Sequence, residues 1–183
     1  MKIHFKKHGA GFKDSSGFTL IEILIVVILL GILATIIIPQ ISVSSDDAKL
    51  NALKTNLANM RSAIELYYYQ HDHTYPGENS VSGVTTADAG VAATAFLQQL
   101  TRFTASTGQT SVTNTGSFTY GPYLKGATLP TNPYNNNVDV LCDATETNIT
   151  VRNSTAADNA WKFYTQTGVL IAADGTAGAH DGL

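Results

Sequence analysis

One acidic side chain, Glu22, lies inside the most apolar stretch of the sequence. The stretch covers residues 18–38, and its other interruptions are Thr19, Gly31 and Thr35. A carboxylate among apolar side chains is costly unless a cation or a hydrogen-bond donor pairs with it. The sequence therefore predicts a charge-pairing role for Glu22. The simpler alternative is that its side chain reaches a nearby aqueous interface.

The apolar stretch has the length of a membrane-spanning helix. A helix over residues 18–38 would be about 31 Å long, close to the thickness of the hydrocarbon core of a bilayer. A cleaved secretory signal peptide is the alternative, but the stretch is long and no small-residue cleavage site follows it. We therefore expect a transmembrane helix over residues 18–38.

The residues before this stretch are basic. Residues 1–17 contain four lysines and one aspartate, a net charge of +3. Because positive flanks stay in the cytoplasm, we expect a cytoplasmic N-terminus and a head on the other side of the membrane. The whole chain carries a net charge of −3, so the part beyond residue 17 is acidic and we expect no nucleic-acid binding.

The sequence around Glu22 resembles a known processing signature. Residues 17–27, GFTLIEILIVV, are similar to the prepilin signature of type IV pilins and type II secretion pseudopilins. The resemblance implies that a prepilin peptidase cleaves between Gly17 and Phe18 and that Phe18 is N-methylated. Residues 1–17 would then be a cleaved leader peptide. Glycine suits the scissile position because it has no Cβ to obstruct the enzyme.

The same resemblance gives Glu22 a partner. Cleavage would create an α-amino group at Phe18, and in this family that amine is thought to pair with the glutamate of a neighbouring subunit. Each charge is costly in an apolar setting, and the two would neutralise one another when subunits associate. We therefore expect Glu22 to determine assembly into a filament.

Pro39 follows the apolar stretch directly. Proline removes one intrahelical hydrogen bond and clashes with the preceding turn. Gly31 is a second weak point of the same helix. The family commonly carries a helix-kinking proline at this position, so we expect a helix kink at Pro39, with Gly31 contributing.

Beyond Pro39 the apolar residues follow a helical period. They recur at spacings of three and four, at Leu50, Leu53, Leu57, Met60, Ile64 and Tyr67, with Ala63 and Leu66 widening the stripe. This pattern predicts an amphipathic helix over residues 39–70. Its apolar face is expected to pack on a sheet.

Residues 71–183 predict a globular α+β head. A short helix is expected from about Thr86 to Phe103, capped by Thr86 or Asp88, and then a polar loop over residues 104–117. Strands are expected at residues 138–141, 148–152, 161–165 and 169–173, and the last two should form a β-hairpin. The expected fold class is α+β and pilin-like, a long N-terminal helix packed on a small antiparallel β-sheet.

The head is also similar to the major pseudopilin of type II secretion, in three short motifs. These are Tyr75-Pro76, Tyr123-Leu124-Lys125 with Leu129-Pro130, and Asn132-Pro133-Tyr134. This sequence departs from the family in having no tryptophan after Pro133 and in its longer Gly-Thr-Asn-rich insertions.

Metal binding is considered at two places. Asp174 and Asp181 in the Gly-rich C-terminal segment could supply oxygen ligands to Ca²⁺, and the pseudopilin resemblance implies a calcium-stabilised loop there. An ordinary frayed tail is the alternative, and no other cofactor is expected. His71 and His73 have no third ligand nearby in the sequence, so we expect solvated histidines rather than a metal site.

Three further features are expected to have no chemical role. Cys142 is the one cysteine and cannot form an intramolecular disulfide, so we expect a buried, inert thiol. Residues 148–150 and 153–155 match the N-glycosylation pattern, which we expect by chance in a segment rich in Asn and Thr. The sequence contains no phosphate-binding loop and no nucleophile motif, so we do not expect this chain to be an enzyme.

The predicted function is structural. The chain is expected to be a subunit of a type II secretion pseudopilus or type IV pilus-like filament, polymerised from the bacterial inner membrane to support protein secretion, with its head in the periplasm. The resemblance implies as partners other copies of the chain, minor pseudopilins, a prepilin peptidase, and an inner-membrane assembly platform with its ATPase. The alternatives are a type IV pilin for adhesion or motility, a single-pass membrane-anchored binding or sensor domain, and a membrane-tethered enzyme.

Overall fold

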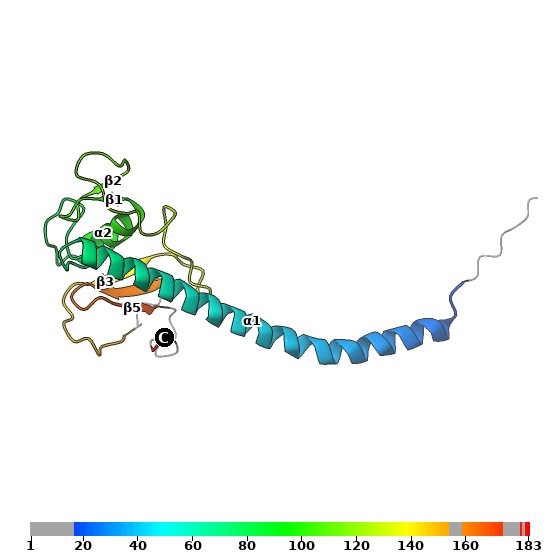
Figure 1. The fold of residues 1–183 in the computed structure, drawn as a ribbon. Coiled ribbons are helices and arrows are strands. Elements are labelled where there is room, and N and C mark those ends of the chain that lie inside the picture. Colours follow the sequence, from blue (N-terminus) through cyan, green and yellow to red (C-terminus); the bar gives the residue numbers. More distant parts are fainter. Residues whose placement is uncertain (1–16, 154–158, 174–179, 181) are drawn as a thin grey trace, which may run out of the picture. The chain divides into compact units, whose positions relative to one another are not determined.

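The computed structural model describes residues 17–153, 159–173, 180 and 182–183, and for residues 36–44 it describes the backbone alone. The chain forms two compact units that divide between Ser45 and Asp46. Helix α1, Leu20–Gln70, contributes residues to both units (Figure 1).

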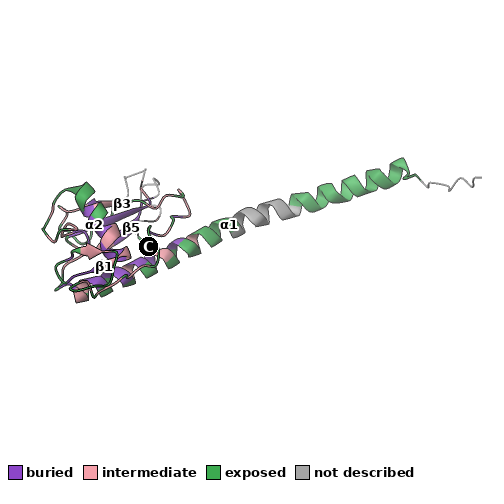
Figure 2. Cartoon of the chain, turned by 90° about the horizontal axis from the view of Figure 1, so that it is seen from above, coloured by how far each residue is buried: buried purple, intermediate pink, exposed green. Residues whose placement is uncertain are grey.

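The N-terminal unit exposes its apolar side chains. Every large apolar side chain from Phe18 to Leu33 is between 50% and 85% exposed (Figure 2). Among the described residues, no helix combines the length and the apolar character that crossing a membrane requires. The transmembrane helix over residues 18–38 stays a prediction.

In the second unit, the last part of α1 buries one stripe of side chains. The buried members of the stripe are Leu53, Leu57, Met60, Ala63, Ile64 and Tyr67, as the helical spacing predicted. Leu66 was expected to widen this stripe, but it is 50% exposed. At 3.6 residues per turn, Leu66 lies about 130° round the helix from the centre of the stripe, so it faces away from the core.

Helix α2 covers Ala89–Thr101, a shorter span than the expected Thr86–Phe103. Asp88 is its N-cap, because its Oδ1 accepts a hydrogen bond from the backbone N–H of Val91 at 2.8 Å. At the other end Arg102 has an extended backbone, which ends the helix and leads into the next strand.

The main sheet has three strands: β3 (Val140–Asp143), β4 (Trp161–Tyr164) and β5 (Val169–Ala172). β4 and β5 pair antiparallel, which confirms the predicted hairpin. β3 pairs parallel with the central strand β4, so the expectation of an antiparallel sheet was wrong at this pair. The long connection between β3 and β4 makes a parallel crossover feasible, whereas a tight turn would not.

Two other strand predictions need correction. The expected loop over residues 104–117 contains a two-stranded antiparallel ribbon of β1 (Phe103–Thr104) and β2 (Thr110–Ser111). The expected strand at residues 148–152 does not form. Asn148 Oδ1 instead accepts a hydrogen bond from the backbone N–H of Thr150 at 3.0 Å, and such local bonds compete with a strand ladder.

The core of the second unit lies between the buried stripe of α1, helix α2 and the main sheet. The rings of Phe96 on α2 and Phe163 on β4 meet with their centroids 4.7 Å apart. Trp161 is fully buried, and its indole N–H donates to the carbonyl oxygen of Pro130 at 2.9 Å. The α+β architecture of this unit is therefore confirmed.

Cys142 lies in this core on β3 and is 1% exposed. Burial raises the pKa of its thiol to about 12, so the thiol stays protonated and unreactive near neutral pH. The prediction of a buried, inert cysteine is confirmed.

Candidate functional site at the start of α1

Thr19 and Glu22 form a reciprocal cap at the first turn of α1. Oε2 of Glu22 accepts hydrogen bonds from the backbone N–H and the hydroxyl of Thr19, both at 2.8 Å. In return the backbone N–H of Glu22 donates to Thr19 Oγ1 at 3.3 Å. This arrangement is a capping box, in which Thr and Glu three residues apart satisfy unpaired groups at a helix start. It also fixes the orientation of the Glu22 carboxylate.

Thr19 was not identified as a site residue from the sequence. The signal was present, because Thr-x-x-Glu before an apolar run is the pattern of a capping box.

The cap does not pair the negative charge of Glu22 with a counter-ion among the described residues. Within the described ranges, its Oε1 accepts no hydrogen bond and neither oxygen has an ion pair. Hydrogen bonds from Thr19 orient the carboxylate, but they do not neutralise it. One oxygen therefore remains available for a cation that the described residues do not supply.

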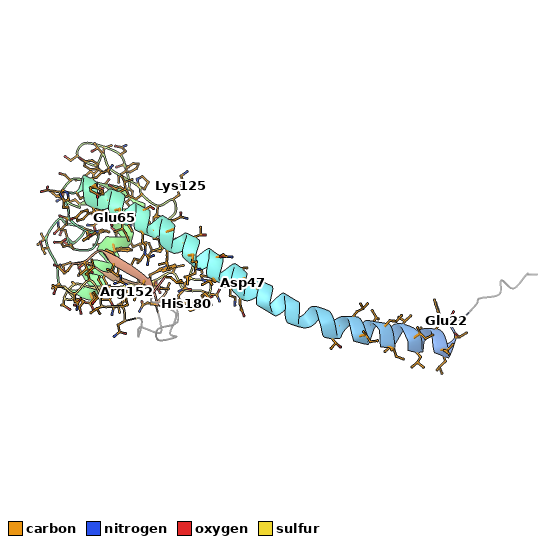
Figure 3. All side chains as sticks on the ribbon, turned by 60° about the horizontal axis from the view of Figure 1, so that its bottom comes forward. Glu22, Asp47, Glu65, Lys125, Arg152 and His180 are labelled. Atoms are coloured by element: carbon orange, nitrogen blue, oxygen red, sulfur yellow. The ribbon has the colours of Figure 1, made fainter. Side chains whose placement is uncertain are left out.

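The surroundings of this carboxylate are apolar and open. Phe18 and Leu20 are 84% and 85% exposed, and Ile21 is 62% exposed. Figure 3 shows Glu22 near the N-terminal end of α1. An apolar surface of this extent marks contact with another protein or with lipid.

The fold itself does not require glycine at residue 17. A Cβ built on Gly17 would meet no atom within 4 Å, and the same holds for Gly31.

The predicted helix kink is not tested. The backbone of α1 is helical through residue 39, but the side chain of Pro39 lies outside the described part of the structure. Near Gly31, the hydroxyl of Thr35 donates to the Gly31 carbonyl oxygen at 2.9 Å. Bonds of this kind satisfy a hydroxyl in an apolar helix and tend to bend it. The sequence analysis did not identify this hydrogen bond of Thr35.

The predicted calcium ligands Asp174 and Asp181 lie outside the described residues. In the part of the chain that the structure describes, no group of three or more His, Cys, Asp or Glu side chains could hold a metal ion.

The expectation that His71 is solvated was wrong, because this residue is 1% exposed. Its Nδ1–H donates to the carbonyl oxygen of Tyr67 at 2.8 Å, and its Nε2 lies 2.9 Å from the hydroxyl of Thr104. Its ring stacks on that of Tyr67 at 3.7 Å. Four residues beyond Tyr67, His71 continues the buried stripe of α1, which is the signal that could have revealed its burial.

Desolvation lowers the pKa of His71, against two backbone hydrogen bonds that act to raise it. The carbonyl of Tyr67 can only accept, so Nδ1 carries the proton and Nε2 accepts from Thr104 in the neutral ring. Both ring nitrogens of His71 therefore have partners within the head, and its ring packs against Tyr67.

Comparison with known proteins identifies the start of the chain. Residues 12–38 match the family model described as the prokaryotic N-terminal methylation motif. No solved structure matches the chain.

Three relatives are each similar to part of the chain. The type II secretion system core protein G of Pseudomonas aeruginosa is 42% identical over 55 residues, which are 30% of this chain and 39% of that protein. The fimbrial protein of Neisseria meningitidis is 35% identical over 71 residues, 39% of this chain and 41% of that protein. The core protein G of Escherichia coli is 29% identical over 63 residues, 34% of this chain and 43% of that protein. The chain thus spans about two fifths of the length of these relatives.

Proposed function

We propose that this chain is a structural filament subunit, which is cleaved between Gly17 and Phe18 and polymerises from the bacterial inner membrane to support protein secretion. The N-terminal methylation motif and the similarity to type II secretion core protein G support this proposal. The type II secretion role is a proposal because the similarity covers only part of those relatives.

The observation that carries the proposal is the state of Glu22. Its carboxylate is oriented by Thr19, has one oxygen without a donor among the described residues, and stands at the end of an exposed apolar surface. Cleavage after Gly17 would place a new α-amino group four residues before it. In a bundle of such helices, the amine of one subunit and the Glu22 carboxylate of another would neutralise each other as the apolar surfaces are covered.

The proposed location follows from the same segment. Residues 18–38 would anchor the subunit in the inner membrane in a single pass before assembly, with the basic leader on the cytoplasmic side and the head in the periplasm. The proposed partners are other copies of the chain, minor pseudopilins, a prepilin peptidase, and an inner-membrane platform with its ATPase. In the filament, neighbouring helices would replace lipid around the apolar side chains.

A type IV pilin for adhesion or motility is the second candidate, and the similarity to a fimbrial protein supports it. The two candidates differ in what a deletion mutant loses. Loss of secreted proteins with cell motility intact favours a pseudopilus, and loss of surface fibres or motility with secretion intact favours a pilus.

Processing is tested with a pair of glycine substitutions. We expect Gly17→Leu to leave the full-length chain in the membrane, because the added side chain obstructs the peptidase at the scissile bond. Gly31→Ala is the matched control, since a Cβ fits at both positions without a contact in the fold. The measurement is the intact mass of membrane-purified protein from cells that express a prepilin peptidase.

The wild type and Gly31→Ala should both begin with N-methylated Phe18. A wild-type chain that keeps residues 1–17 in such cells would reject the proposed processing, and so would normal cleavage of Gly17→Leu.

A further inference from the structure

The segment between β3 and β4 contains an exposed asparagine, Asn148. Residues 147–150 are all exposed, and Ile149 is 62% exposed. Asn148-Ile149-Thr150 matches the acceptor pattern for N-linked glycans, Asn-x-Ser/Thr. The sequence alone could not separate this match from chance, because the segment is rich in Asn and Thr.

The structure shows that Asn148 and Thr150 interact as a unit. Oδ1 of Asn148 accepts hydrogen bonds from the backbone N–H of Thr150 at 3.0 Å and from its hydroxyl at 2.8 Å. Within the described residues, Nδ2 of Asn148 donates to no acceptor. Two donors on Oδ1 polarise the amide and make its Nδ2 protons more acidic. An amide nitrogen becomes a useful nucleophile only as it loses a proton, so the geometry favours reaction at Nδ2.

A series of hydrogen bonds and an ion pair connects Asn148 to the main sheet. The backbone N–H of Asn148 donates to Oε1 of Glu146 at 2.7 Å. The backbone N–H of Glu146 in turn donates to Oδ1 of Asp143 on β3, at 3.2 Å. Asp143 forms an ion pair with Lys162 on β4, at 3.8 Å. Asn148 is therefore fixed relative to the sheet while its side-chain nitrogen faces solvent.

A hydrogen bond also holds the C-terminal side of the turn at residues 148–150. Arg152, labelled in Figure 3, donates from its guanidinium to the carbonyl oxygen of Ile149 at 2.7 Å. Bonds on both sides keep the turn compact. An enzyme that binds an exposed turn of this kind pays less to order it than it would for a random loop.

We propose that Asn148 is the acceptor of an N-linked glycan. The donor is an oligosaccharide joined to a polyprenyl diphosphate, and an oligosaccharyltransferase catalyses the step. A bond forms between Nδ2 of Asn148 and the anomeric carbon, the bond from that carbon to the diphosphate oxygen breaks, and the polyprenyl diphosphate leaves. The proton from Nδ2 passes to a base on the transferase. In cells this inference rests on the proposed function, which places the head outside the cytoplasm.

The second match to the pattern provides an internal comparison. Two residues before Asn153 the chain has Val151, whereas two residues before Asn148 it has Glu146. Its backbone N–H donates to the hydroxyl of the buried Tyr164 at 3.0 Å, which ties it to β4. Ser154 and Thr155 lie outside the described residues. Only at Asn148 does the structure describe the whole acceptor pattern, so the inference is made for Asn148.

The test uses the purified full-length chain in detergent, a purified bacterial oligosaccharyltransferase and a polyprenyl-diphosphate-linked oligosaccharide. Intact mass and peptide mapping report the product. We expect one glycan on the peptide that contains Asn148, its loss in Asn148→Gln and Thr150→Ala, and its retention in Thr150→Ser and Asn153→Gln. The melting temperature of each variant shows that the fold is intact, as expected for exposed positions.

An unmodified chain would overturn the inference if a control acceptor peptide is glycosylated in the same reaction. Modification at Asn153 alone, or retention of the glycan in Thr150→Ala, would overturn it as well. Because this reaction needs neither the leader nor delivery across a membrane, its failure leaves the proposed filament function standing. Failure of the Gly17 processing test likewise leaves the glycosylation result intact.

Discussion

Glu22 caps the first turn of α1 and carries a negative charge in an apolar segment. Its Oε2 belongs to the capping box with Thr19, and its charge has no counter-ion in the described structure. The sequence was enough to locate the charge in an apolar run. It did not reveal that the carboxylate is held in place before any partner arrives, because that depends on the geometry of the first helical turn.

His71 makes a second prediction at the scale of one residue. Desolvation lowers the pKa of His71 in the folded head below the ordinary value of about 6.5. As the pH falls, the unfolded chain therefore protonates His71 before the folded head does. The free energy of unfolding should therefore fall as the pH drops from about 7 to about 5. The expected loss is a fraction of the ~1.4 kcal/mol per pH unit that one fully linked proton would give.

The measurement is thermal unfolding of the full-length chain in detergent across this pH range. His71→Phe keeps an aromatic ring against Tyr67 but cannot titrate, so its stability should depend less on pH. Equal slopes for the two proteins would show that His71 does not control the acid sensitivity.

At the scale of elements, α2 depends on its cap. We expect Asp88→Ala to lower the free energy of unfolding by about 1 kcal/mol, because the backbone N–H of Val91 loses its acceptor. Asp88→Asn is the matched control and should be close to neutral, since Asn caps about as well as Asp. Chemical denaturation of the full-length chain in detergent measures both. A loss in Asp88→Asn as large as that in Asp88→Ala would contradict the capping role.

The sequence predicted best those elements in which apolar residues recur at a regular spacing. The buried stripe of α1 and the β4–β5 hairpin follow from spacing and turn residues alone. The parallel pairing of β3 with β4 could not be predicted, because every residue of the central strand β4 is buried and no alternation reveals its neighbours. The expected strand at residues 148–152 failed because Asn148 and Thr150 bond locally.

At the scale of the whole molecule, the two units differ in whether their apolar side chains are buried. The second unit encloses its apolar side chains in one core, whereas the N-terminal unit leaves side chains from Phe18 to Leu33 at least half exposed. Such a surface is not stable in water unless lipid or other protein chains cover it. The composition of the sequence already indicated two different surroundings for the two parts.

The most direct measurement compares filament yield for two substitutions at the start of α1, in cells that assemble the wild-type chain. Glu22→Gln keeps a capping side chain three residues after Thr19 but removes the charge, and Thr19→Ala removes the cap but keeps the charge. Filaments are sheared from the cells or sedimented, and subunit in filaments is compared with processed subunit left in the membrane. Glu22→Gln should be processed and stay in the membrane, while Thr19→Ala should still form filaments. Filaments of Glu22→Gln at the wild-type yield would contradict the account.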